Sequence, residues 1–249
     1  MTITIAITGK GGNGKTTVAR SLLSNLKEIY PSKTILIVDN DLSSDFAQSF
    51  GLEIKERISN IREGRYEYKS KIPYGMPKME FVEWALQDII VNLNNDIDLI
   101  ATGTMLSKQC NCFLSGLINE AMVKLVKQYD IVIFDCEYDL EYLNILVDYP
   151  IDVTLIITDV NISSVCSADR ILQSSLKLAS PGQIGVVLNK VKDKQIPENI
   201  SSALEEYELD ILGRLPYDED LAANSIEKKS VLLNDAARQL IFRLNLPPS

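Results

Sequence analysis

Histidine is absent from this 249-residue chain, and tryptophan occurs once. The lack of histidine excludes His-based catalytic triads, histidine general bases and histidine metal ligands, so Cys, Asp and Glu remain as candidate metal ligands. Basic residues are also few, because 25 Lys and Arg stand against 34 Asp and Glu and give a net charge of −9. An overall negative field repels phosphate backbones and anionic lipid, so we expect neither nucleic acid nor a membrane as a partner.

Long apolar runs are missing as well. Stretches such as 131–134 and 153–157 are strand-sized and far shorter than the roughly 20 residues that span a bilayer. Residues 1–8 lack a basic region and run directly into a strand pattern, which argues against a signal peptide. Four cysteines are too few for a disulfide scaffold in a chain of this length. We therefore expect a cytoplasmic protein with free thiols.

The hydrophobic pattern alternates short β-branched runs with longer amphipathic stretches, which is typical of βα units that build a mostly parallel sheet. No linker divides the chain, so the sequence predicts one α/β domain over residues 1–249, doubly wound and flanked by helices. Strands are expected at 3–8, 34–38, 98–101, 131–134, 153–157, 184–188 and 211–215, and helices at 15–29, 81–92, 113–128, 163–178, 198–205 and 234–245.

Two segments stand apart from this pattern. Residues 51–78 combine glycines and prolines with many charges and tyrosines, and we interpret them as an irregular, inserted surface segment. The last predicted helix places Leu240, Ile241 and Leu244 on one stripe, with only two arginines as cations. A membrane-surface helix has more basic residues, so docking of this helix on the body of the protein is the better interpretation.

A glycine-rich motif lies between the first predicted strand and the first long helix. Residues 9–17, GKGGNGKTT, satisfy the pattern G-x-x-x-x-G-K-T. Glycines let the backbone wrap a phosphate, and the N–H groups then point inward at the positive end of a helix. The sequence therefore predicts a P-loop NTPase fold that binds ATP and Mg²⁺, with Lys15 on the β- and γ-phosphates and Thr16 on Mg²⁺. The expected phosphate-binding residues are Gly11, Gly12, Asn13, Gly14, Lys15, Thr16 and Thr17.

Lys10 is a second lysine early in this loop, and this form resembles the deviant Walker A ATPases. These include the nitrogenase iron protein, the MinD and ParA partitioning ATPases, the tail-anchored-protein targeting ATPases and the metal-centre maturation ATPases. In that superfamily the early lysine reaches across a twofold interface to the partner's nucleotide. The resemblance implies a homodimer that closes around two ATP molecules, with Lys10 and Lys15 as catalytic residues.

Further landmarks of this superfamily follow in order. Residues 39–45, DNDLSSD, resemble switch I, in which Asp41 falls where the family places the carboxylate that orients the attacking water; a solvated acidic loop is the alternative. Asp135 ends an apolar strand, where a Walker B carboxylate holds a magnesium-bound water. The resemblance implies Thr16, Asp41 and Asp135 as magnesium residues. The implied adenine-binding residues are Asn189, Lys190, Pro216, Tyr217 and Asp218.

The pair Cys110 and Cys112, separated by one residue, precedes the helix predicted at 113–128. A nearby helix N-terminus lowers the pKa of thiols toward the thiolate that metals require. If two chains meet about a dyad there, four sulfurs can surround one ion tetrahedrally. Such a site suits zinc, and nickel or an iron–sulfur cluster are alternatives. A chance pair of core cysteines is the remaining interpretation.

The cysteine pair resembles that of the CooC-type ATPases, accessory proteins of nickel carbon monoxide dehydrogenase. Matches continue at 102–103, 135–137, 140–143, 158–159 and 167–171. The resemblance implies an ATP-driven dimer that binds nickel or zinc and assists nickel insertion into carbon monoxide dehydrogenase or a related client. Asp139 replaces a family glycine whose backbone senses the γ-phosphate, so we expect hydrolysis to be slow. Cys136 is interpreted as structural and Cys166 as a core residue.

Two other functions remain as alternatives. One is an iron–sulfur reductase resembling the nitrogenase iron protein, although Tyr142 stands where that family has a cluster cysteine. The other is a MinD/ParA-like positioning protein that binds membrane or DNA when ATP closes the dimer. That function uses a basic amphipathic tail or a basic surface, and the chain is acidic overall.

Overall fold

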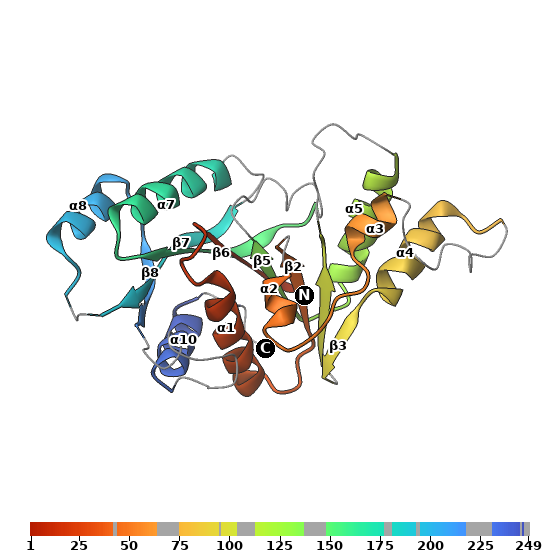
Figure 1. Cartoon of the computed structure of the whole chain (residues 1–249), viewed down its shortest axis with the longest axis horizontal. Coiled ribbons are helices and arrows are strands. Elements are labelled where there is room, and N and C mark those ends of the chain that lie inside the picture. Colours follow the sequence, from red (N-terminus) through yellow and green to blue (C-terminus); the bar gives the residue numbers. More distant parts are fainter. Residues whose placement is uncertain are drawn as a thin grey trace.

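An eight-stranded sheet runs through the molecule in the order β3-β4-β2-β5-β1-β6-β7-β8 (Figure 1). The computed structural model describes residues 1–41, 44–63, 75–94, 96–103, 113–136, 148–176, 181–192, 195–217, 231–244 and 246. All pairings are parallel except that between β3 and β4, so the predicted α/β class with a mostly parallel sheet is confirmed. The strands are β1 (Ile3–Gly9), β2 (Ile35–Asn40), β3 (Val91–Asn94), β4 (Ile97–Ala101), β5 (Ile131–Cys136), β6 (Ile151–Asp159), β7 (Pro181–Val191) and β8 (Ile211–Pro216).

Helices cover both faces of this sheet, as a doubly wound fold requires (Figure 1). On one face lie α1 (Lys15–Ile29), α2 (Asp45–Gln48) and α10 (Val231–Arg243). On the other lie α3 (Ile58–Arg62), α4 (Lys78–Asp88), α5 (Phe113–Val126), α7 (Ile162–Ser175) and α8 (Glu198–Glu206). Because successive residues of a strand point to opposite faces, Ile5 packs in one core and Ala6 in the other.

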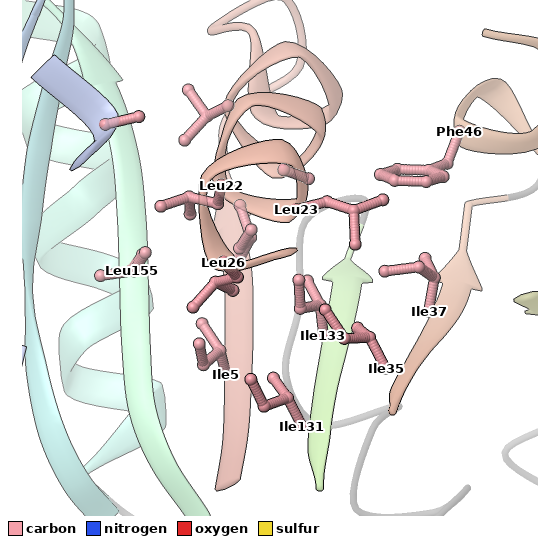
Figure 2. Packing of buried hydrophobic residues seen from close by; sticks show 14 of the residues in the cluster. Ile5, Leu22, Leu23, Leu26, Ile35, Ile37, Phe46, Ile131, Ile133 and Leu155 are labelled. Atoms are coloured by element: carbon pink, nitrogen blue, oxygen red, sulfur yellow. The ribbon is translucent and has the colours of Figure 1, made fainter. Parts of the chain in front are cut away.

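The core beneath α1 is dense and aliphatic. Figure 2 shows Leu22 and Leu26 of α1 on the side of the helix that faces the sheet, where Leu26 lies next to Ile5. Leu22 and Leu26 are four residues apart and therefore share one helix face, and both are completely buried. Burial of one such side chain contributes about 1.5–3 kcal/mol, so this contact fixes α1, and with it the loop that precedes α1, on the sheet.

The structure corrects two expectations about local elements. The helix expected over 81–92 ends at Asp88, and 91–94 instead forms the edge strand β3. Residues 51–78 are not wholly an irregular surface segment, because α3 lies within them and Ile54, Ile58 and Ile61 are buried. These isoleucines recur every three or four residues, which gives the segment one apolar face that packs on the body. Residues 64–74 lie outside the described part of the chain.

The last helix, α10, docks on the body of the protein as predicted. Leu240, Ile241 and Leu244 are 1%, 2% and 5% exposed, and α10 packs against α1 and β8. Gly213 of β8 provides room for this contact, since a Cβ added there would lie 3.0 Å from Leu240 Cδ1. Among the helices of the described ranges, none is long and apolar enough to cross a bilayer.

Candidate functional site

The glycine-rich loop lies at the carboxyl end of β1 and leads directly into α1. The N-cap residue of α1 is Gly14, whose φ of 87° is a left-handed conformation that favours glycine. A Cβ on Gly14 would lie only 2.6 Å from Asn189 Nδ2, so a side chain there would displace the Asn189 amide from its hydrogen bond to Asn13. Gly11, Gly12 and Thr17 are exposed. The loop therefore presents its backbone at the N-terminus of a 15-residue helix, where N–H groups and the helix dipole favour anions.

Neighbouring strands hold this loop in place. Asn13 Nδ2 donates to the carbonyl oxygen of Ile157 in β6 at 3.0 Å. From the end of β7, Asn189 Nδ2 donates to the carbonyl oxygen of Asn13 at 2.8 Å, and Lys190 Nζ donates to that of Gly12 at 2.6 Å. The structure thus brings Asn189 and Lys190 against the loop.

The remaining residues expected to bind the adenine base lie at the end of β8, which pairs with β7. Pro216 ends β8, and the N–H of Tyr217 donates to the carbonyl oxygen of Val191 at 2.9 Å. Lys192 Nζ lies 4.5 Å from the centroid of the Tyr217 ring, within the range of a cation–π contact. Asp218 is outside the described residues. Two of the three expected base-covering residues are therefore seen beside the end of β7.

An acidic cluster lies at the start of α1. Thr16 Oγ1 donates to Asp135 Oδ2 at 2.9 Å, and Asp135 is paired in register with the fully buried Asp39 of β2. Burial raises the pKa of Asp135 to about 7. The Thr16 hydrogen bond and the Lys15 charge oppose this rise in pKa, whereas the charges of Asp39 and Asp41 add to it. Negative charge is therefore concentrated here without full compensation.

This arrangement fits a magnesium ion. Mg²⁺ prefers oxygen ligands, usually keeps several waters, and binds through one or two carboxylates together with phosphate oxygens. The Thr16 hydroxyl and the Asp135 and Asp41 carboxylates provide oxygens of this kind. In the described ranges no three carboxylates or thiols lie close enough to hold an ion by themselves. An ion at this point would thus need phosphate and water as further ligands.

The segment after β2 is tied to its neighbours through Asp39. Asp39 Oδ1 accepts from the N–H of Asp41 at 3.3 Å, and Oδ2 accepts from the N–H of Ala47 at 3.2 Å. At the end of β4, the N–H of Thr102 donates to the carbonyl oxygen of Asp39 at 3.0 Å, and its hydroxyl donates to Asn40 Oδ1 at 2.9 Å. Asp39 has no assigned role in the sequence-based prediction, and the structure shows it as a buried residue that holds the turn carrying Asp41.

Lys10 contacts a residue that sequence reasoning missed. Lys10 Nζ donates to Ser163 Oγ at 2.7 Å. Ser163 lies in the first turn of α7, where its N–H donates to the side chain of the N-cap Asn161. The pairing of β1 with β6 brings these distant segments together, and no local pattern around Ser163 signals the contact.

The four cysteines differ in what the structure says of them. Cys110 and Cys112 lie outside the described residues, as does Asp139. Cys136 is 1% exposed at the end of β5, which agrees with a structural role. Cys166 is only partly buried on α7, with Sγ 3.6 Å from the hydroxyl of Tyr207, so its prediction as a core residue is wrong. Its outward position follows from the helix phase, because Val165 and Ala168 occupy the buried face.

Comparison with known proteins places this site in a family. A relative from Methanocaldococcus jannaschii, an uncharacterized ATP-binding protein, is 31% identical over 221 residues, covering 88% of this chain and 86% of the relative. A ParA family ATPase from Chlorobium tepidum superposes with a TM-score of 0.69 at 18% identity, covering 99% of each chain. The septum site-determining protein MinD from Pyrococcus horikoshii, solved with Mg-ADP, gives a TM-score of 0.66 at 19% identity, covering 98% of this chain and 96% of that one. These two structures share the fold.

The family model that matches extends over nearly the whole chain. It describes the CobQ/CobB/MinD/ParA nucleotide binding domain and aligns with residues 4–231. The match includes the glycine-rich loop, the acidic cluster and the Asn189 and Lys190 contacts described above. The chain therefore belongs to the CobQ/CobB/MinD/ParA nucleotide-binding domain family.

Proposed function

We propose that this protein is an ATP-binding, slowly hydrolysing homodimeric switch. The observation that carries the proposal is the 2.9 Å hydrogen bond from Thr16 to Asp135, which joins the start of α1 to the end of β5 beneath the glycine-rich loop. A hydroxyl and a buried carboxylate at the mouth of a phosphate loop are the groups that bind Mg²⁺ together with a triphosphate. The high pKa of Asp135 supports a cation at this point, since a cation favours the ionised carboxylate.

Each residue of the site has a role in this proposal. The backbone of residues 11–17 and the Lys15 ammonium bind the triphosphate, and Asp41 orients the attacking water. Thr16, Asp41 and Asp135 hold Mg²⁺, which when bound neutralises charge on the phosphate oxygens. Lys10 leaves Ser163 and reaches the nucleotide of the partner subunit. The adenine base is bound by Asn189, Lys190, Pro216, Tyr217 and Asp218.

We further propose that Cys110 and Cys112 of two subunits hold one nickel or zinc ion, and that the dimer assists nickel insertion into carbon monoxide dehydrogenase or a related enzyme. The segment that carries them begins directly after Gly103. Thr102, the preceding residue, hydrogen-bonds both Asp39 and Asn40. A change at Asp39 and Asn40 can therefore reach Thr102 through hydrogen bonds, and Cys110 follows Thr102 by eight residues along the chain.

Anaerobic metal titration with and without Mg·ATP tests the two parts separately. Wild-type protein is expected to bind one Ni²⁺ or Zn²⁺ per dimer, and Cys110→Ser with Cys112→Ser to bind none while retaining ATP affinity. Lys15→Ala is the matched counterpart. It keeps both cysteines and is expected to lose ATP affinity. Full metal stoichiometry in the double-serine variant would refute the metal site. Unchanged ATP affinity in Lys15→Ala would refute the nucleotide site.

A second candidate is a MinD/ParA-like positioning protein, which the similarity to MinD and ParA structures favours. Two features weigh against it. The helix α10 buries its apolar stripe in the body, and the net charge is −9. Pelleting with anionic liposomes or DNA in the presence of Mg·ATP separates the candidates. Nucleotide-dependent pelleting, combined with no metal binding, would replace the metal-delivery proposal with this one.

A further inference from the structure

The turn that carries Asp41 is held at its entry by β4. Thr102 donates its N–H to the carbonyl oxygen of Asp39 and its hydroxyl to the side chain of Asn40, at 3.0 and 2.9 Å. These bonds fix the two residues that precede Asp41. The entry of the turn therefore has the rigidity of the sheet, because Thr102 directly follows β4, which is paired on both sides.

The exit of the turn is held at Ser44. The N–H of Ser44 donates to the carbonyl oxygen of Asp41 at 3.2 Å, and the carbonyl oxygen of Ser44 accepts from the N–H of Gln48, the last residue of α2. Ser44 is completely buried and has a φ of 54°, which is uncommon for a residue with a side chain. A residue in this conformation needs support from its surroundings. That support includes Arg57, whose Nε donates to Ser44 Oγ at 3.4 Å.

Arg57 is itself held by the same strand end that fixes the entry. It is the N-cap residue of α3, and the next residue but one, Ser59, donates its N–H to the carbonyl oxygen of Thr102 at 2.9 Å. Gly103 leaves the space for this packing. With its φ of 68°, a Cβ there would lie 2.4 Å from Ser59 Oγ and 2.8 Å from Arg57 Cδ. Thr102 and Arg57 therefore belong to the same packed group of residues around Gly103, and from there Thr102 holds the entry of the turn and Arg57 its exit.

Ser44 and Arg57 both line a cavity of about 480 Å³. Gln48 and Glu53 are among the residues that line it with them. The turn consequently has free volume beside it at its exit. If the guanidinium is removed, Ser44 can relax into this volume, and Asp41 moves with it.

We propose that Arg57 is a positioning residue for ATP hydrolysis, which fixes Ser44 and thereby the turn that presents Asp41 to the attacking water. The inference rests on the proposed function, because it assumes that Asp41 orients this water. Arg57 acts through Ser44 and does not touch the nucleotide in this role. Its loss should therefore reduce turnover and leave nucleotide binding nearly unchanged.

The first test is the kinetics of Mg·ATP hydrolysis by Arg57→Met. We expect kcat to fall by about 10- to 100-fold, because small displacements of a catalytic group have effects of this size, and KM to change less than about threefold. Lys55→Met is the matched control, since Lys55 is an exposed cation two residues away. Ser44→Ala should lower kcat similarly. The double variant should be no worse than either single one, as expected for two residues of one contact.

The second test does not need hydrolysis. Hydrogen exchange of the backbone amides of residues 44–48 in nucleotide-free protein should be faster in Arg57→Met and Ser44→Ala than in wild type or Lys55→Met. Wild-type kcat in Arg57→Met, additive effects in the double variant, or unchanged exchange would each overturn the inference. If wild-type protein does not hydrolyse ATP, the proposed function fails, and the exchange result alone decides whether Arg57 fixes the turn.

Discussion

At the residue scale, Asp135 has the largest electrostatic consequence. Its pKa is raised to about 7 by burial and by the charges of Asp39 and Asp41, against an ordinary value of 3.8. A folded state that keeps this proton longer than the unfolded chain is stabilised at low pH. That stabilisation is lost as the pH rises through the pKa of the folded state. The nucleotide-free protein therefore carries a penalty above pH 7 that a bound cation would remove.

Asp135→Asn removes this titration and keeps a hydrogen-bond acceptor for Thr16. In nucleotide-free buffer with EDTA, we expect the variant to gain stability over wild type by roughly 1 kcal/mol per pH unit between pH 4 and 7, because only wild type must lose this proton over that range. The gain should level off above pH 7. Urea denaturation at several pH values measures this difference in the free energy of unfolding.

Asp130→Asn is the control with the opposite sign. The backbone N–H of Thr34, followed by the side chain of Lys33, lowers the pKa of Asp130. A lowered pKa stabilises the folded state above the unfolded pKa, and this contribution is lost as the pH falls through the pKa of the folded state. Asp130→Asn should therefore be less stable than wild type at neutral pH and equal to it in acid. A difference for Asp135→Asn that does not depend on pH would contradict the assignment.

The sequence predicts the residues of the phosphate loop because a continuous motif specifies them. Lys15 and Thr16 begin α1 as the pattern requires, and Asp135 is recognisable as the polar end of an apolar strand. Ser163 and Arg57 were missed. Each contacts its partner through side chains brought together by strand pairing and helix packing, and a single sequence carries no local signal for such contacts.

At the element scale, α10 offers a direct test of docking. Leu240→Ala removes a side chain that is 1% exposed and packs on Gly213, so we expect a loss of about 2–4 kcal/mol in the free energy of unfolding. Phe242→Ala is the control, because Phe242 is 69% exposed on the same helix and its loss should change stability by less than about 0.5 kcal/mol. Chemical denaturation measures both. Equal stability of Leu240→Ala and wild type would show that α10 leaves the body in solution.

Elements whose apolar residues follow one clear periodicity were predicted well. Elements in which the helical and strand patterns run together were not. The helix expected at 15–29 has those bounds in the structure, because its apolar residues keep one face and a glycine precedes it. The end of α4 was missed because Ile89 and Ile90 extend the apolar pattern beyond the last helical residue. The strand β3 has only four residues and lies at the edge, where half-exposed alternation gives a weak signal.

At the scale of the whole molecule, Lys10 tests dimer closure. In the single chain the ammonium group of Lys10 donates one hydrogen bond, to Ser163. Breaking this bond so that Lys10 can reach the partner's nucleotide costs only about 1 kcal/mol. We expect wild type to dimerise with Mg²⁺ and a non-hydrolysable ATP analogue. Lys10→Ala should remain monomeric and bind the analogue with affinity within about threefold of wild type. Light scattering after size exclusion, with isothermal titration for affinity, gives both quantities.

Lys27→Ala is the control for dimer closure. Lys27 lies near the opposite end of α1 and forms an ion pair with Asp96 at 2.8 Å. This variant should dimerise like wild type, because the altered cation is a helix length away from the nucleotide. Dimerisation of Lys10→Ala to the wild-type extent would remove the proposed role of the early lysine.

The strand order also governs how the chain reaches its final form during translation. The first strand, β1, lies between β5 and β6, and Ile3 is aligned with Ile131 while Ile5 is aligned with Val153. More than a hundred residues must therefore leave the ribosome before β1 gains either neighbour. Such distant pairings form slowly, and until they form, apolar strand segments stay exposed to chaperones and to aggregation. The glycine-rich loop that follows β1 is thus synthesised early but reaches its final position only after β5 and β6 have been made.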